Sequence, residues 1–201
     1  MLDGPHAGIE QRVLALPGAI AEPSAGKELF RVWRGPSEHF VSLFVGDRWR
    51  IENIGRLLVD CATALSVQIV ESAGQADTAI RDSILNEALH TYRDLFEASS
   101  GDSGPTENPG YQEEVHSRMA RVPVANPEAE DAYEIYRGWA DGKTLRSSIR
   151  AQSLDTVDRA SMLVAHLMTH YCRAFAARDA TSVSATADRL DKSVRKIQTG
   201  S

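Results

Sequence analysis

The stretch Glu28-Leu29-Phe30-Arg31-Val32-Trp33 returns 106 positions later as Glu134-Ile135-Tyr136-Arg137-Gly138-Trp139. Both copies follow the pattern E-[LI]-[FY]-R-x-W, so the likeness includes matched arginines and tryptophans. With that offset held and no gap, eleven pairs are identical between positions 16–95 and 122–201. Average composition would give about five identities by chance. The sequence therefore predicts an internal duplication, in which one ancestral unit occurs twice in the chain.

Each copy begins with a pattern that predicts a β-hairpin. The two strand candidates of the first copy are separated by Gly35-Pro36-Ser37, and those of the second by Asp141-Gly142. Both separators are typical of tight turns between antiparallel strands. The strand candidates are 28–34 and 39–45 in the first copy, and 133–139 and 144–150 in the second.

Two helices are predicted after each hairpin. Apolar residues recur at helical spacing over 51–69 in the first copy and over 157–175 in the second. A further stripe covers 80–95, and a narrower seam covers 183–197. The last of these helices would be marginal alone, so we expect it to pack on a partner helix.

A two-stranded hairpin is marginally stable in water, so a lone copy would be weak. We therefore expect an α+β fold in which both hairpins join in one pseudo-symmetric antiparallel sheet with the helices packed on one face. The first repeat would span 1–98 and the second 112–201. Between them, 99–111 is rich in Gly, Ser, Pro and acidic residues and predicts a flexible linker. Two independent domains joined by that linker are the alternative.

Composition narrows the possible classes of function. The 201 residues are 42% hydrophobic and 25% charged, with a net charge of −6, as in an ordinary globular protein. The acidic balance disfavours nucleic-acid binding, and no apolar run is long enough to cross a membrane. Cys61 and Cys172 lie within helical patterns and are expected to be buried thiols. With no signal-peptide pattern at the N-terminus, the cytoplasm is the expected location.

Short motifs resemble a known family. Arg137-Gly138-Trp139-Ala140-Asp141-Gly142 with the helix that follows, Val41-Ser42-Leu43, and Gly55-x-Leu57-Leu58-Val59-Asp60-x-Ala62 are similar to a small bacterial family catalogued as domain of unknown function 5076. The resemblance implies a tandem version of that unit and a bacterial source, and it implies no activity. The second copy departs from the motif, because Ser161 and His166 stand where it has glycine and aspartate.

Few residues carry a recognisable chemical pattern. His166 and His170 stand four apart on a predicted helix, a spacing at which two imidazoles can share a metal ion. They fall at the flank of the apolar stripe and have no third ligand nearby in sequence, so we expect partly exposed packing residues and no metal. No phosphate loop, dinucleotide fingerprint or nucleophile elbow occurs. We therefore expect no cofactor and no catalytic residue.

The duplicated motif does predict a candidate interaction face. Residues two apart in a strand point to the same side, so Arg31 projects with Trp33, and Arg137 with Trp139. The same alternation brings residues of the second strand of each hairpin to that side. The face comprises Arg31, Trp33, Phe40, Phe44, Arg137, Trp139, Arg146 and Arg150.

Two uses of this face are open. It would suit a protein partner or self-association, and a small anionic ligand could bind its guanidinium groups. The same side chains could instead pack against each other, against the linker or against a second copy, as unusual aromatic faces more often do. We expect a non-catalytic module for binding or assembly. The alternative is an anionic-ligand binder or an enzyme that uses Arg137, Arg146 and Arg150.

Overall fold

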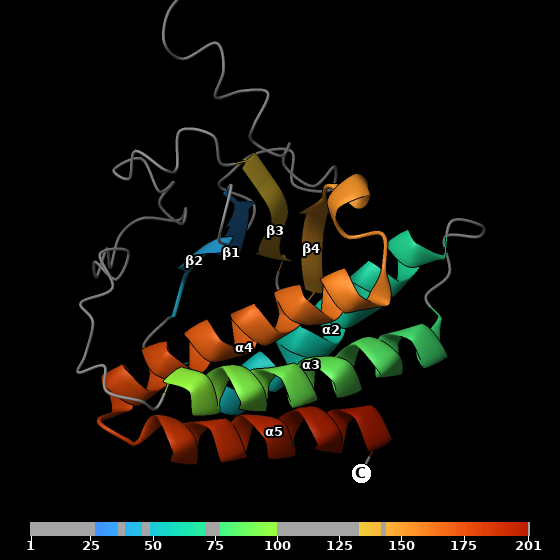
Figure 1. Ribbon diagram of the computed structural model, residues 1–201. Coiled ribbons are helices and arrows are strands. Elements are labelled where there is room, and N and C mark those ends of the chain that lie inside the picture. The colour runs from blue at the N-terminus through green and yellow to red at the C-terminus, as the bar shows by residue number, and fades with distance from the viewer. Residues whose placement is uncertain are drawn as a thin grey trace, which may run out of the picture. The chain divides into compact units, whose positions relative to one another are not determined.

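The computed structural model describes residues 27–35, 39–45, 49–70, 77–99, 133–141 and 144–200. Within these ranges the protein is α+β, with one four-stranded antiparallel sheet and four α-helices (Figure 1). The sheet was predicted, and so was each of the helices. The chain divides into two compact units, one holding the strands and one the helices, and each unit takes segments from both halves of the sequence.

The strands are ordered β2-β1-β3-β4, so the hairpins join through their first strands. Residues 28–33 and 134–139 of the two central strands are buried, as expected where a strand has neighbours on both sides. The two ends of each predicted strand lie within two residues of the ends of an observed strand. The bounds are Lys27–Arg34 for β1, His39–Leu43 for β2, Tyr133–Asp141 for β3 and Thr144–Ile149 for β4.

Strand register is the same in both hairpins at the 106-residue offset. Phe30 pairs with Leu43 in the first hairpin, and Tyr136 pairs with Ile149 in the second. Between the hairpins, β1 and β3 pair around a centre at which Arg31 faces Arg137. Each residue pair on one side of this centre corresponds, at the 106-residue offset, to a pair on the other side, as Lys27–Ala140 does to Arg34–Tyr133.

Two register shifts flank the centre. Leu29 is the extra residue of β1 between two paired positions, and Ile135 is the extra residue of β3. Each accepts a backbone hydrogen bond just beyond the hairpin ladder, from Phe44 to Leu29 at 2.8 Å and from Arg150 to Ile135 at 2.9 Å. An extra residue changes which side chains face the same side of a strand, and this sets up the site described below.

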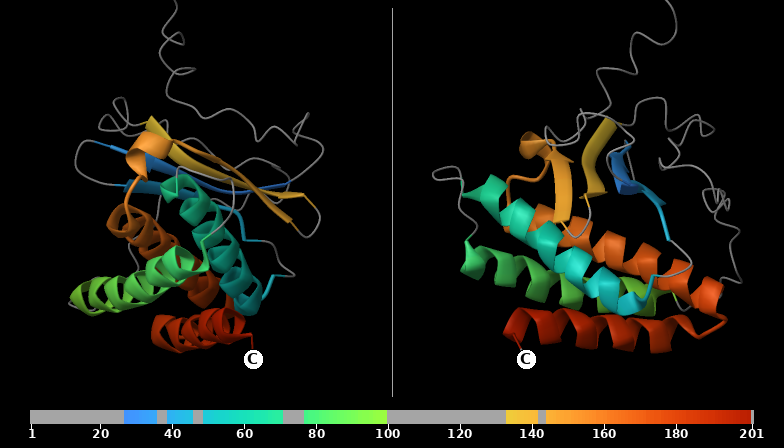
Figure 2. Two further views of the ribbon diagram at one scale, coloured as in Figure 1. Left: turned by 90° about the vertical axis from the view of Figure 1, so that its right-hand side faces the viewer. Right: turned by 180° about the vertical axis from the view of Figure 1, so that it is seen from behind.

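In the helical unit, α3 packs chiefly on α4, and α5 chiefly on α2. Figure 2 shows these helices from two further sides. Helices from different halves of the sequence therefore depend on one another for burial, as predicted for the last helix. The bounds are Ile51–Ile69 for α2, Thr78–Ser99 for α3, Val157–Asp179 for α4 and Val183–Thr199 for α5, with a short 3-10 turn at Ala151–Ser153.

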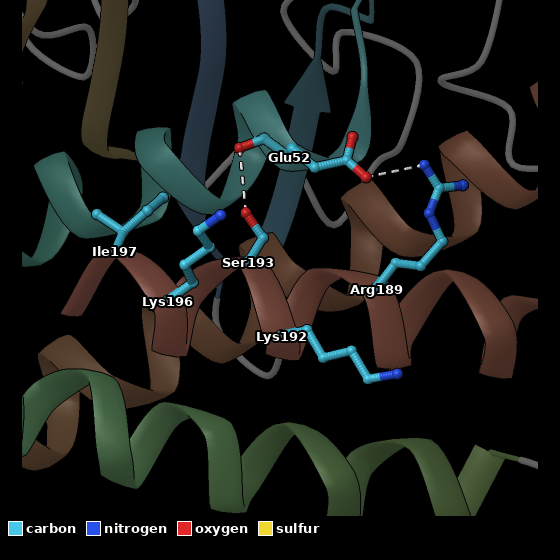
Figure 3. A pocket seen from close by; sticks show the side chains of 6 residues that line it. All are labelled: Glu52, Arg189, Lys192, Ser193, Lys196 and Ile197. Atoms are coloured by element: carbon cyan, nitrogen blue, oxygen red, sulfur yellow. Dashed lines mark hydrogen bonds and ion pairs between the residues drawn. The ribbon is translucent and has the colours of Figure 1, made fainter. Parts of the chain in front are cut away.

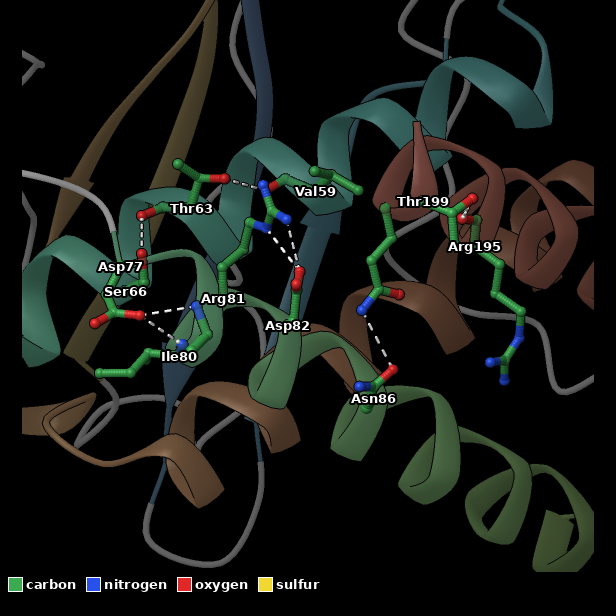
Figure 4. A network of polar contacts seen from close by, with 12 residues as sticks. Val59, Thr63, Ser66, Asp77, Ile80, Arg81, Asp82, Asn86, Arg195 and Thr199 are labelled. Atoms are coloured by element: carbon green, nitrogen blue, oxygen red, sulfur yellow. Dashed lines mark hydrogen bonds and ion pairs between the residues drawn. The ribbon is translucent and has the colours of Figure 1, made fainter. Parts of the chain in front are cut away.

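Local hydrogen bonds fix where these helices begin. The Asp77 carboxylate accepts from the backbone N–H groups of Ala79 and Ile80 at 2.8 and 3.1 Å, which caps the start of α3 (Figure 4). Thr156 and Ser182 cap α4 and α5 through their hydroxyl oxygens. Such caps satisfy backbone donors that have no partner inside the helix.

Both cysteines are free and buried, as predicted. The Tyr92 hydroxyl donates to Cys172 Sγ at 3.1 Å. Burial raises the pKa of the Cys172 thiol to about 11, so this thiol stays protonated at neutral pH. Along the described ranges, no helix combines the length and apolarity that crossing a bilayer requires.

Two expectations about organisation stay predictions. The placement of the helices on one face of the sheet is one of them. The other is the division into repeats at 1–98 and 112–201, of which 1–26 and 112–132 lie outside the described residues. The linker predicted at 99–111 also lies outside them, apart from Ser99 at the end of α3.

Candidate functional site

Two glutamates and two arginines of the duplicated motif meet at the centre of the sheet. Arg31 Nε lies 2.8 Å from Glu28 Oε1 and 3.8 Å from Glu134 Oε1. Arg137 Nε lies 2.9 Å from Glu134 Oε1 and 3.2 Å from Glu28 Oε1. Each carboxylate is thus shared by both guanidinium groups. We call these four residues the Glu–Arg cluster.

The Glu–Arg cluster is buried and formally neutral. Both glutamates are 0% exposed and both arginines 3%. Removing a charge from water costs several kcal/mol per ion, and only close pairing and hydrogen bonding offset that cost. The cluster meets this condition because two positive and two negative groups neutralise each other. Its arginines are therefore committed to carboxylates within the chain.

The register shifts explain how the cluster forms. In a regular strand, residues three apart point to opposite sides, which would separate Glu28 from Arg31. The extra residue Leu29 brings them to the same side, and Ile135 does the same for Glu134 and Arg137. Strict alternation along a regular strand leaves both glutamates out of the predicted face. The identical E-x-x-R spacing in the two copies was the signal that could have found them.

The register brings most of the predicted face to one side of the sheet. Trp33 pairs with Phe40 across the first hairpin, and Trp139 pairs with Arg146 across the second. Arg31 faces Arg137 between the hairpins. Directly opposed residues share a side of the sheet. Phe44 and Arg150, the remaining two predicted residues, come directly after edge strands β2 and β4.

Burial divides the predicted face. Arg31, Trp33, Arg137 and Trp139 are buried, with the two indoles 3% and 0% exposed. These four side chains therefore pack within the chain, which is one of the alternatives that the sequence left open for this face. Arg146 is exposed, and Phe44 and Arg150 are half-buried, whereas the side chain of Phe40 lies outside what the structure describes. As an interaction face the eight residues stay a prediction.

Cation–π contacts recur with the roles exchanged between the halves. Lys27 Nζ lies 3.3 Å from the centroid of the Phe44 ring. At the equivalent positions, Tyr133 supplies the ring and Arg150 the cation, with Arg150 Cζ 5.4 Å from the ring centroid. Arg150 Nε also donates to the Glu134 carbonyl at 3.0 Å. Such contacts contribute about 0.5–2 kcal/mol depending on burial, and here they fix Arg150 against the sheet.

The indole nitrogens of Trp33 and Trp139 are buried polar atoms for which the described part of the chain offers no hydrogen-bond acceptor. Leaving a buried donor unsatisfied costs about 1–3 kcal/mol. The two donors occupy equivalent positions in the two halves. A buried water molecule that accepts from each indole would recover that cost.

His166 and His170 lie on α4. Burial lowers the pKa of His166, and burial together with the nearby charges of His166 and Arg173 lowers the pKa of His170 to about 4. Both imidazoles are therefore neutral at pH 7. Within the described ranges, no group of three or more His, Cys, Asp or Glu is placed to hold a metal ion.

His170 makes the stability of the fold depend on pH. Its pKa falls from 6.5 to about 4 on folding, so below pH 6.5 the unfolded chain binds a proton that the folded chain resists. Stability present above pH 6.5 is lost as the pH falls, by about 2 kcal/mol between pH 8 and pH 5. Urea unfolding at both pH values measures it. The loss should be about 2 kcal/mol smaller in His170→Gln, and an equal loss in both proteins would contradict the assignment.

No family model, curated protein or solved structure matches the chain. The resemblance to domain of unknown function 5076 therefore stays a prediction.

Proposed function

We propose that this protein is a non-catalytic cytoplasmic module for binding or assembly, built by duplication of a unit of one hairpin and two helices. The observation that carries the proposal is the Glu–Arg cluster. It uses the charged residues of the duplicated motif to join the two halves of the sheet. In this proposal the motif works as an internal interface, in which its four charged residues pair with one another.

Several features support the duplication. The hairpin registers, the two extra residues and the cation–π contacts all recur at the 106-residue offset. The pairing of Arg31 with Arg137 lies where a two-fold axis would relate the halves. A single unit with this motif would bring the same residues to a symmetric dimer interface. Fusion of two units makes that interface permanent.

The second candidate is binding of a small anion, and the exposure of Arg146 favours it. Of the three arginines predicted to bind the anion, Arg137 is paired instead with two carboxylates of the chain. Arg150 is also engaged, with the Tyr133 ring and the Glu134 carbonyl. We therefore rank anion binding at the sheet below binding or assembly.

Light scattering and thermal melting together test the proposal. We expect the purified chain either to form an oligomer of fixed mass or to form a complex of fixed stoichiometry with a protein captured from lysate and then purified. A ligand at a hundredfold excess over its Kd stabilises a protein by about 2.7 kcal/mol. We expect that no phosphorylated or carboxylated metabolite raises the Tm by the amount that a stabilisation of this size would produce.

A contrary result has a defined form. A metabolite that raises the Tm of the chain but not of Arg146→Gln/Arg150→Gln would establish the anion-binding alternative. The matched control is Arg56→Gln/Arg159→Gln, which removes two exposed arginines from the helical unit. This control should keep any such rise.

A further inference from the structure

A groove of about 400 Å³ lies between α2 and α5 (Figure 3). The helices approach closely there because Gly55 has no side chain: a Cβ at Gly55 would lie 2.2 Å from Ser193 Oγ. Ser193 in turn donates to the Glu52 carbonyl at 3.2 Å. The groove is lined by Glu52, Arg189, Lys192, Ser193, Lys196 and Ile197.

The cations of this groove differ in what they bind. Arg189 reaches the Glu52 carboxylate at 3.0 Å, as Figure 3 shows. Lys192 and Lys196 are exposed, and neither forms an ion pair with any residue in the described ranges. By contrast Arg195, on the same helix but outside the groove, is paired with Asp191. Two positive charges of the groove are thus uncommitted.

The positions of the cations set the shape of ligand that fits. Arg189, Lys192 and Lys196 are spaced three and four residues apart in a row that spans about 10 Å of helix, with Arg189 paired with Glu52 and the two lysines carrying the charge that is unpaired among the described residues. A single phosphate group is too small to neutralise such a row. Ile197 and the methylene stems of the lysines add apolar surface beside it. An elongated anion with an apolar side matches both properties.

We propose that this groove binds an acidic amphipathic helical segment of a protein partner. Carboxylates at i and i+4 of such a segment would match the spacing of Lys192 and Lys196, and its apolar residues would cover Ile197. A nucleic acid fits less well, because the chain as a whole carries a net charge of −6 and repels a long polyanion. The inference deepens the proposed function by naming a partner class, and it rests on the binding role proposed there.

Fluorescence anisotropy with a labelled peptide tests the inference on the full chain. The probe is a helical peptide of about fourteen residues, or four turns, with Glu and Leu placed at the spacing above. We expect Lys192→Gln/Lys196→Gln to weaken its binding about tenfold, and added salt to weaken binding to the unaltered chain. Lys192→Arg/Lys196→Arg keeps both charges and should bind the peptide as the unaltered chain does.

Matched controls decide the outcome. Arg173→Gln/Arg195→Gln removes two charges outside the groove and should change the affinity less than about twofold, the size expected of weak long-range effects. Equal weakening by the two neutralised pairs would overturn the proposal, as would equal binding of a peptide with Gln in place of Glu. Tighter binding of single-stranded DNA, or displacement of the peptide by millimolar phosphate, would overturn it too. Any of these results leaves the assembly measurement by light scattering unaffected.

Discussion

Replacing Arg137 with methionine is expected to lower the free energy of unfolding by about 3–5 kcal/mol, because it leaves a buried charge uncompensated. Glu28 and Glu134 lie 3.2 and 2.9 Å from this guanidinium and are fully buried. After the substitution, Arg31 alone would face two carboxylates. Urea unfolding followed by circular dichroism at pH 7 measures the loss.

Two companion variants separate the loss of charge balance from the loss of one side chain. Arg56→Met removes a guanidinium that is 69% exposed and paired with Asp60, and should cost less than about 1 kcal/mol. Replacing all four members of the Glu–Arg cluster with methionine removes every buried charge. Such wholesale replacement is often neutral or stabilising, so this protein should be more stable than Arg137→Met. A quadruple variant less stable than the single one would contradict the electrostatic explanation.

The same buried cluster explains why the two halves pair in one register. A shift of β3 against β1 by one residue would move Arg137 to the other side of the sheet and away from Glu28. Each arginine would keep the glutamate of its own strand but would lose the cross-strand carboxylate, at 3.2 Å for Arg137 and 3.8 Å for Arg31. The same shift would move Tyr136 to the opposite side of the sheet and away from Phe30, so it would disturb the apolar packing as well. We therefore infer that the cross-strand contacts of the duplicated charges and the apolar packing both favour the observed register.

Hydrophobic periodicity was enough to locate the strands and helices. The predicted turn residue Gly35 directly follows β1, whereas Asp141 is the last residue of β3 and pairs with Thr144. The other predicted turn residues, Pro36, Ser37 and Gly142, lie outside the described residues. The apolar spacing from Ile51 onward placed α2. These signals are local, since they depend on residues within one or two turns of each other. Joining the hairpins into one sheet followed from the instability of a lone hairpin.

The content of the candidate site could be predicted only in part. Alternation placed Trp33 with Phe40 and Trp139 with Arg146, but it said nothing of burial, which depends on what else the chain brings to that side. It also missed Glu28 and Glu134, because neither Leu29 nor Ile135 has a sequence signature of an extra strand residue. Glycine would have been such a signature. The one glycine in this part of the sheet, Gly138, serves a different purpose.

Replacing Gly138 with valine, the residue that its counterpart Val32 carries, is expected to cost about 3 kcal/mol through overpacking. A Cβ at this position would lie 2.3 Å from Cε1 and 2.4 Å from Cζ of the Phe30 ring. That ring is 0% exposed and meets Tyr136 edge-on, with ring centroids 5.0 Å apart. A valine side chain at this position would therefore have to displace a buried ring. Thermal and urea unfolding measure the change.

A double-mutant cycle with Phe30→Ala tests whether the ring is the cause. Phe30→Ala alone should cost about 3–5 kcal/mol because it opens a cavity. The valine side chain would then fill part of that cavity, so the double variant should lose at least about 1.5 kcal/mol less than the two single losses together. Ala140→Val, at a half-buried position of the same strand, should change stability by less than about 0.5 kcal/mol. Additive losses in the cycle would mean that the glycine is required for another reason. A positive coupling would mean that this one contact accounts for the difference between the two halves at this position. The first half has Val32, whereas the second has glycine, which leaves room for the Phe30 ring against β3.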